Sequence, residues 1–154
     1  MSLSMITDRT AADVNTAAAL RLKIQSGQTL TENEQGIFER GACTITMLNR
    51  VENAQKYLAE VLNGHSYKVS ITNKTWQNNQ IFEYADYIRL LDNESTLKNA
   101  FAVYKDTPKT PDYLYGWQEA NDIEKILIDI EALIGEMKKN FKKCGTFKCG
   151  GDIL

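Results

Sequence analysis

Apolar residues recur at alternating steps of three and four positions between residues 118 and 142. The members of this stripe are Ala120, Ile123, Leu127, Ile130, Ile134, Met137 and Phe141. Such spacing places every member on one face of an α-helix that would be roughly 37 Å long. The pattern fits a helix of the protein's own core, and it also fits the seam of an oligomer. Periodicity alone does not separate these two.

The first third of the chain shows the same helical periodicity, together with start signals. Thr10 with Asp13, and Thr31 with Glu34, have the spacing of an N-cap hydroxyl and an acidic side chain three residues later. Gly27, Gly41 and Asn63-Gly64 supply left-handed stops. Helices are therefore predicted over about 11–25, 32–40 and 44–63.

The period then changes from helical to alternating. Tyr67, Val69 and Ile71 are separated by single polar residues, which predicts one short strand over about 66–73. A further helical region follows over about 80–104. Its polar run Asp92–Ser95 predicts a kink or a division into two helices, because small polar side chains compete for backbone hydrogen bonds.

Two prolines, Pro108 and Pro111, exclude helix over about 105–116 and predict an ordered loop. After the last helix, the residues from 144 to 154 become rich in glycine and contain two cysteines. A second short strand over 145–150 is compatible with this tail. Because an unpaired strand edge favours pairing with another chain, we expect the tail to contribute to assembly.

The predicted fold class is mainly α, a helical bundle of four or five helices with a minor β element. For the domain organisation we expect one helical domain over 5–143 followed by the tail. Residues 1–4 stand ahead of a second methionine at position 5, and we expect them to come from an expression vector.

Length and charge limit the possible classes of function. A chain of 154 residues is long enough for one domain with a sizeable core. With 18 Lys and Arg against 20 Asp and Glu, the net charge of -2 gives no general attraction to nucleic acid or anionic lipid. No apolar run is long enough to span a bilayer, and the start lacks the pattern of a signal peptide. We expect no nucleic-acid partner, no membrane partner and no secretion signal.

The three cysteines are an odd number, which fits reduced thiols better than a secreted disulfide framework. Cys43, Cys144, Cys149 and His65 contain the ligand types that zinc prefers. Structural zinc sites, however, usually draw on cysteine pairs two to four residues apart, and Cys144 and Cys149 are five apart. We expect no metal and no cofactor. A disulfide between Cys144 and Cys149 remains an alternative to free thiols.

No residue set carries a catalytic signature. His65 is the single histidine and is predicted to lie solvated in a turn. The carboxylates of the last helix are predicted to form its solvated face, and the lysines at its end to complement the helix dipole. We therefore expect no enzyme. The residues singled out for partner contact are Trp76, Tyr113, Tyr115, Trp117 and Phe147. The alternative is that such aromatic side chains close the ends of the helical core.

Several segments that cover most of the chain carry a family resemblance in combination. They are Ile6–Thr10 with Asp13 and Val14, Leu30 and Thr31 with Glu34, Gly41 and Ala42, Leu48–Val51 with Ala54 and Tyr57–Ala59, Glu119–Leu127 with Asp129 and Ile130, and Gly145–Phe147. This set resembles small proteins encoded by prophages of Gram-positive gut bacteria. Genes of that family tend to lie among tail and other virion structural genes. Cys144 and Cys149 depart from the family pattern, which has small or polar residues there.

The resemblance implies a non-enzymatic phage structural or interaction protein associated with the tail or baseplate. Its expected partners are other virion proteins, with a homo-oligomer as one form of assembly. Its expected location is the virion, or the host cytoplasm during assembly. Two alternatives from other classes are a small cell-wall hydrolase with carboxylates as acid and base, and a cytoplasmic helical adaptor or regulator that binds a peptide in a groove.

Overall fold

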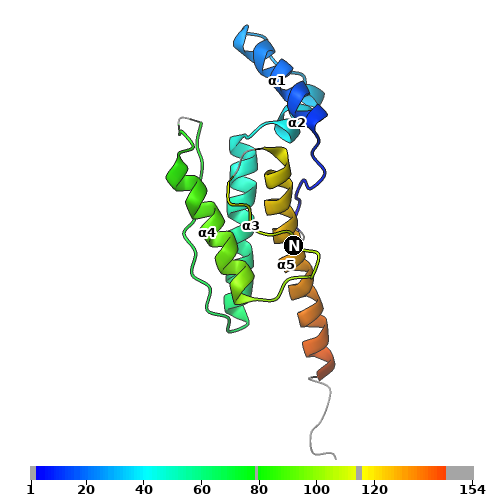
Figure 1. The fold of residues 1–154 in the computed structure, drawn as a ribbon, viewed down its shortest axis with the longest axis vertical. Helices are drawn as coiled ribbons and strands as arrows, with labels where there is room; N and C mark the ends of the chain where they lie inside the picture. The colour runs from blue at the N-terminus through cyan, green and yellow to red at the C-terminus, as the bar shows by residue number, and fades with distance from the viewer. Residues whose placement is uncertain (1–2, 79, 114–115, 145–154) are drawn as a thin grey trace, which may run out of the picture.

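A computed structural model of the chain describes residues 3–78, 80–113 and 116–144, with side chains up to residue 140. The described part is mainly helical and contains no strand, as the predicted helical bundle requires (Figure 1). The five helices are α1 (Ala11–Gln25), α2 (Glu32–Gly41), α3 (Ile45–Gly64), α4 (Tyr84–Ala100) and α5 (Trp117–Cys144). These bounds lie within a few residues of the predicted ones.

The helices α3, α4 and α5 form the body of the molecule, and all three run in the same direction (Figure 1). Contacts between α3 and α4 have a parallel register. Glu52 pairs with Arg89 at 2.5 Å, and one turn further along both helices Gln55 accepts a hydrogen bond from Asn93. Helices that run in the same direction cannot be joined by short turns, so each connection returns along the whole length of the bundle.

The predicted apolar stripe of α5 faces the protein's own core. Ala120, Ile123, Leu127, Ile130 and Ile134 are all buried. The four isoleucine and leucine side chains of this set pack with side chains of α3 and α4, among them Leu58, Leu62 and Leu97, which are completely buried. The heptad pattern therefore serves intramolecular packing in the described structure. None of the described helices combines the length and the apolar character needed to cross a membrane.

The predicted strand over 66–73 is wrong. The alternation does place Val69 in the core and exposes its neighbours Lys68 and Ser70, but this segment lies extended on the helices without a β partner. Its backbone groups bond to side-chain amides instead. Asn63 accepts from the N–H of Val69 and donates to its C=O, both at 2.8 Å. A side-chain amide presents one donor and one acceptor, as a neighbouring strand would.

The same amide pairing recurs along the returning connections. The side-chain amide of Asn93 bonds to the N–H and C=O of Thr72 in this way, and that of Asn49 bonds to the N–H and C=O of Trp76. On α5, the side-chain amide of Asn121 bonds to the N–H and C=O of Arg9 and so attaches the N-terminal segment to the bundle. Extended segments thus lie on helices with their backbone polar groups satisfied, which is required when they are partly buried.

The predicted interruption of the fourth helix is also wrong, because α4 runs without a break from Tyr84 to Ala100. The reason is that the side chain of Asn93 bonds to Thr72 and Gln55 across the core and does not compete for its own backbone. The loop predicted over 105–116 is confirmed for its described residues. The second strand over 145–150 and the tail fall outside the described residues.

The helices α1 and α2 form a hairpin that projects beyond the end of the body at which α3 and α5 begin (Figure 1). Both predicted capping boxes are present, at Thr10 with Asp13 and at Thr31 with Glu34. The two helices approach closely at Gly41, where an added Cβ atom would lie 2.1 Å from the carbonyl oxygen of Asp13. Only glycine fits this contact without a shift of the backbone.

Candidate functional site

A buried ion cluster stands where the hairpin meets the body. One oxygen of Glu124 on α5 accepts hydrogen bonds from Arg9 at 2.5 Å and from Arg50 at 2.7 Å, and its other oxygen accepts from the N–H of Ile6. Glu124 is completely buried and Arg9 nearly so. Because a buried charge is stable only when it is paired and hydrogen-bonded, this cluster has a structural role, to hold the N-terminal segment on α5.

A second set of ion pairs braces the base of the hairpin. Arg40 at the end of α2 contacts Asp8 at 3.0 Å and Asp13 at 3.2 Å. The hydrogen bond from Arg40 lowers the pKa of Asp8, while bonds from Thr10, aided by Arg40, lower the pKa of Asp13. Both carboxylates therefore stay charged near neutral pH and keep the base of the hairpin in place.

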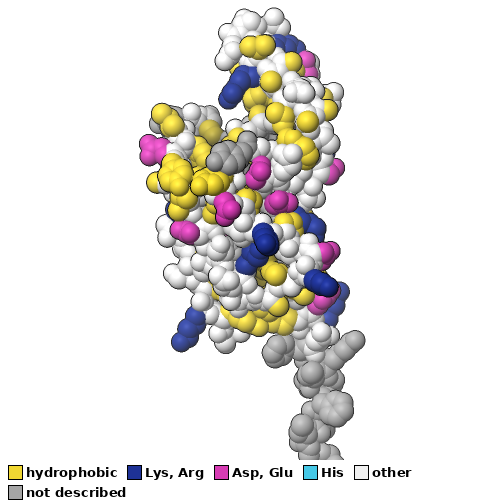
Figure 2. Space-filling view, in the orientation of Figure 1, with side chains coloured by type: hydrophobic (Ala, Val, Ile, Leu, Met, Phe, Trp, Pro, Cys, Tyr) yellow, Lys and Arg dark blue, Asp and Glu magenta, His cyan; other side chains and the backbone are white. Residues whose placement is uncertain are grey.

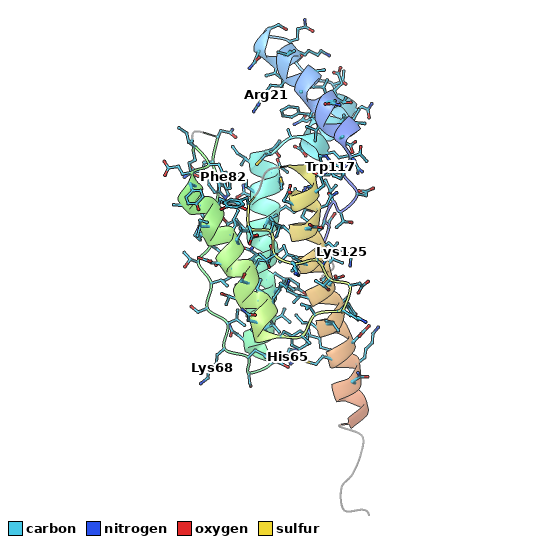
Figure 3. The ribbon with its side chains drawn as sticks, in the orientation of Figure 1. Arg21, His65, Lys68, Phe82, Trp117 and Lys125 are labelled. Atoms are coloured by element: carbon cyan, nitrogen blue, oxygen red, sulfur yellow. The ribbon has the colours of Figure 1, made fainter. Side chains whose placement is uncertain are left out.

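A cavity of about 510 Å³ opens between the base of the hairpin and the beginnings of α3 and α5. Its wall is largely apolar, and Figure 3 shows two of its aromatic members, Phe82 and Trp117, at this end of the body. The size is typical of pockets that receive a small molecule or an anchoring side chain. The lining residues are Arg9, Val14, Arg40, Gly41, Ala42, Cys43, Met47, Phe82, Gly116, Trp117 and Ala120.

A wider groove of about 710 Å³ runs along the hairpin itself. Apolar side chains from both hairpin helices and from α3 line it, among them Ile24, Phe38 and Ile45. Cys43 lies in the wall of both hollows. Cys43 is exposed, and partial loss of hydration raises the pKa of its thiol, so the thiol is protonated at neutral pH and a poor nucleophile.

Exposed apolar side chains gather near these hollows. Leu22 and Ile24 on α1 are 67% and 44% exposed, and Ile81 and Tyr84, where α4 begins, are 79% and 68% exposed. Figure 2 shows apolar side chains on the hairpin and on the adjacent tip of α4. Because large apolar side chains are rarely this exposed together unless a partner covers them, this end of the molecule is the candidate interaction surface.

The aromatic residues that the sequence singled out for partner contact lie in different environments in the structure. Trp76 is buried, donates to Glu52 at 3.3 Å and packs against Phe82, so it belongs to the core. Trp117 is half-buried in the cavity wall, and Tyr113 is 48% exposed. Tyr115 and Phe147 lie outside the described residues. Of the three aromatic residues of this set that the structure describes, Trp117 alone lines the candidate surface.

The candidate zinc ligands are not brought together. Cys43 precedes α3 and His65 follows it, so the 20 residues of that helix, roughly 30 Å, separate them. Among the residues that the structure describes, no group of His, Cys, Asp or Glu has the arrangement of a metal site. The side chains of Cys144 and Cys149, and therefore the possible disulfide between them, lie outside the described part.

One residue that sequence reasoning missed is Glu94 on α4. Its side chain is completely buried, and within the described chain neither oxygen has a partner at hydrogen-bonding geometry. Loss of hydration raises the pKa of Glu94 to about 8, although Thr110 and Lys98 act against the rise. Its position four residues after Leu90 and three before Leu97 was the available signal, because that spacing places it on the apolar face.

Compared with protein-family models, with curated proteins and with solved structures, the chain matches none.

Proposed function

We propose that this protein is a non-enzymatic structural or interaction protein of a phage or prophage particle, associated with the tail or baseplate. The resemblance to prophage-encoded proteins supports a place in a phage particle. The surface around the hairpin supports an interaction role. The single observation that carries the interaction role is the exposure of Leu22, Ile24, Ile81 and Tyr84 beside two hollows. Other virion proteins are the proposed partners, in the virion or in the host cytoplasm during assembly.

The protein composition of purified phage particles tests whether this protein is one of their components. Prophage induction followed by density-gradient purification of the particles should bring this protein into the same fraction as tail proteins, at a constant ratio to them. Deletion of the gene should yield particles with a missing or altered tail or baseplate in electron micrographs. If purified particles lack the protein and form normally without it, the virion role is wrong.

The groove along the hairpin favours the adaptor as a second candidate, because a peptide helix would fit between apolar walls of this size. The genetic neighbourhood distinguishes the two. Tail, baseplate or holin genes beside this one support the particle, whereas regulatory genes support an adaptor.

The carboxylate hydrolase has one supporting observation, the raised pKa values of Glu94 and of Asp122, each caused chiefly by loss of hydration. A general acid needs such a raised pKa, but it also needs contact with substrate, and Glu94 is completely buried. Purified protein should therefore leave cell-wall glycan intact. Turnover that disappears in Glu94→Gln would reverse the choice between these functions.

A further inference from the structure

The α1–α2 hairpin exposes most of its apolar side chains. Ala17 is the only buried apolar residue in α1, and α2 contains no buried residue at all. Leu22 and Ile24 point their side chains into solvent, while Leu30 and Phe38 line an open groove. Helices of 15 and 10 residues gain most of their stability from packing an apolar face, so this arm lacks a covering element.

Two opposite charges lie in the same groove. Arg21 is exposed on the side of the hairpin that faces the beginning of α4 (Figure 3), and among the described residues it has no hydrogen bond or ion pair. Glu39 on α2 accepts a hydrogen bond from the hydroxyl of Thr46 at 3.3 Å and likewise has no cationic partner in the described structure. Each charge is thus available for a partner of opposite sign.

We propose that the hairpin is a dimerisation arm, which packs against the same hairpin of a second copy of this chain about a twofold axis. A twofold contact is self-complementary, so Arg21 of each copy meets Glu39 of the other and the ion pair forms twice. The apolar side chains of the two grooves, Ile24, Leu30, Phe38 and Ile45, then form a shared core. The four helices of the two arms bury together the surface that each hairpin exposes alone.

A second copy explains this groove better than an unrelated partner does, because the groove contains both members of the ion pair as well as the apolar anchors. A partner of single-sign charge would leave either Arg21 or Glu39 without a counter-charge in a desolvated contact, which is costly. The inference goes beyond the proposed function and does not depend on it, since a twofold dimer can exist inside or outside a particle.

The first experiment measures the mass of the full chain by light scattering and by sedimentation velocity over a range of concentrations. The expected species is a dimer. Ile24→Asp should raise the dissociation constant roughly ten-fold or more, because a charge then enters the shared core. Lys68→Asp is the control, since Lys68 is exposed at the opposite end of the body (Figure 3), and it should leave the dimer intact. Helical circular dichroism should be unchanged in both variants.

The second experiment reverses the charges. Arg21→Glu and Glu39→Arg should each weaken the dimer, whereas the double variant and a mixture of the two single variants should both dimerise, because each pairs Glu with Arg twice. A chain that stays monomeric at high concentration overturns the proposal. So does a dimer that tolerates Ile24→Asp, or one that only Lys68→Asp disrupts. Failure of both charge reversals to change the dissociation constant would show that the ion pair, and with it the twofold arrangement, is wrong.

Discussion

Asn93 on α4 and Thr72 in the connection between α3 and α4 exchange two hydrogen bonds. The N–H of Thr72 donates to Oδ1 of Asn93 at 3.0 Å, and Nδ2 of Asn93 donates to the carbonyl oxygen of Thr72 at 2.8 Å. Nδ2 also donates to Gln55 on α3 at 3.1 Å. One buried side chain therefore joins two helices and an extended segment, and it replaces the strand partner that the segment lacks.

Asn93→Ala should lower the free energy of unfolding by about 1 to 3 kcal/mol, because it removes the acceptor of the Thr72 N–H and the donor to the buried amide oxygen of Gln55. Urea denaturation followed by circular dichroism measures this change. Asn99→Ala, at an exposed position of the same helix, is the matched control and should stay within about 0.5 kcal/mol of the parent. Equal effects of the two substitutions would mean that the amide of Asn93 contributes no more than its helix propensity.

Glu94 should make the protein less stable as the pH rises. Its pKa is about 8 in the folded chain and near 4.5 when unfolded, so between these values the folded state alone keeps the proton. Stability should then fall by about 1.4 kcal/mol per pH unit from roughly pH 5 to pH 8 through this group, and level off above its folded pKa.

The test of Glu94 compares urea midpoints at pH 5 and pH 8 for the parent and for Glu94→Gln, which cannot ionise. The variant should lose less stability across this range than the parent does. Glu60→Gln, a substitution of an exposed carboxylate on α3, should retain the dependence of the parent. Identical slopes for parent and Glu94→Gln would show that the carboxyl of Glu94 is hydrated in solution.

Two glycines of α2 should respond in opposite directions to alanine. At Gly41 the new Cβ atom would lie 2.1 Å from the carbonyl oxygen of Asp13, so Gly41→Ala should force α1 and α2 apart at a cost of about 1 to 3 kcal/mol. At Gly36 nothing lies within 4 Å, so Gly36→Ala should stabilise the helix by about 0.5 to 1 kcal/mol. Amide hydrogen exchange in α1 and α2 reports both changes. Slower exchange in Gly41→Ala would contradict the close approach of the two helices.

Ile130→Ala should lower the free energy of unfolding by about 2 to 5 kcal/mol, because Ile130 is completely buried and its truncation leaves a cavity. Ile128→Ala is the control on the same helix, at a position that is only partly buried, and it should cost clearly less. Chemical denaturation gives both values. A denaturation midpoint unchanged in Ile130→Ala would indicate that the apolar stripe of α5 forms an oligomer interface and not the core of the monomer.

Local signals in the sequence determined which segments are helical and where α1 and α2 begin. The capping boxes at Thr10 and Thr31 depend only on neighbouring residues, and the spacing of the stripe in α5 depends only on the helical repeat. These features could be predicted because hydrogen bonds and side-chain spacing within one helix involve residues at most a few positions apart. Of the candidate surface, the sequence supplied Trp117 but gave no reason to select Leu22, Ile24 or Ile81.

Only the tertiary structure decided where the backbone of the extended segments finds its partners, and hence that residues 66–73 are not a strand. Alternating side chains describe any extended chain with one buried face, whereas a strand also needs a neighbour, and the amides of Asn63 and Asn93 take that place. Tertiary packing likewise decided that Glu94 is buried and that the hairpin projects from the body. These outcomes depend on contacts between residues far apart in the chain, which periodicity does not record.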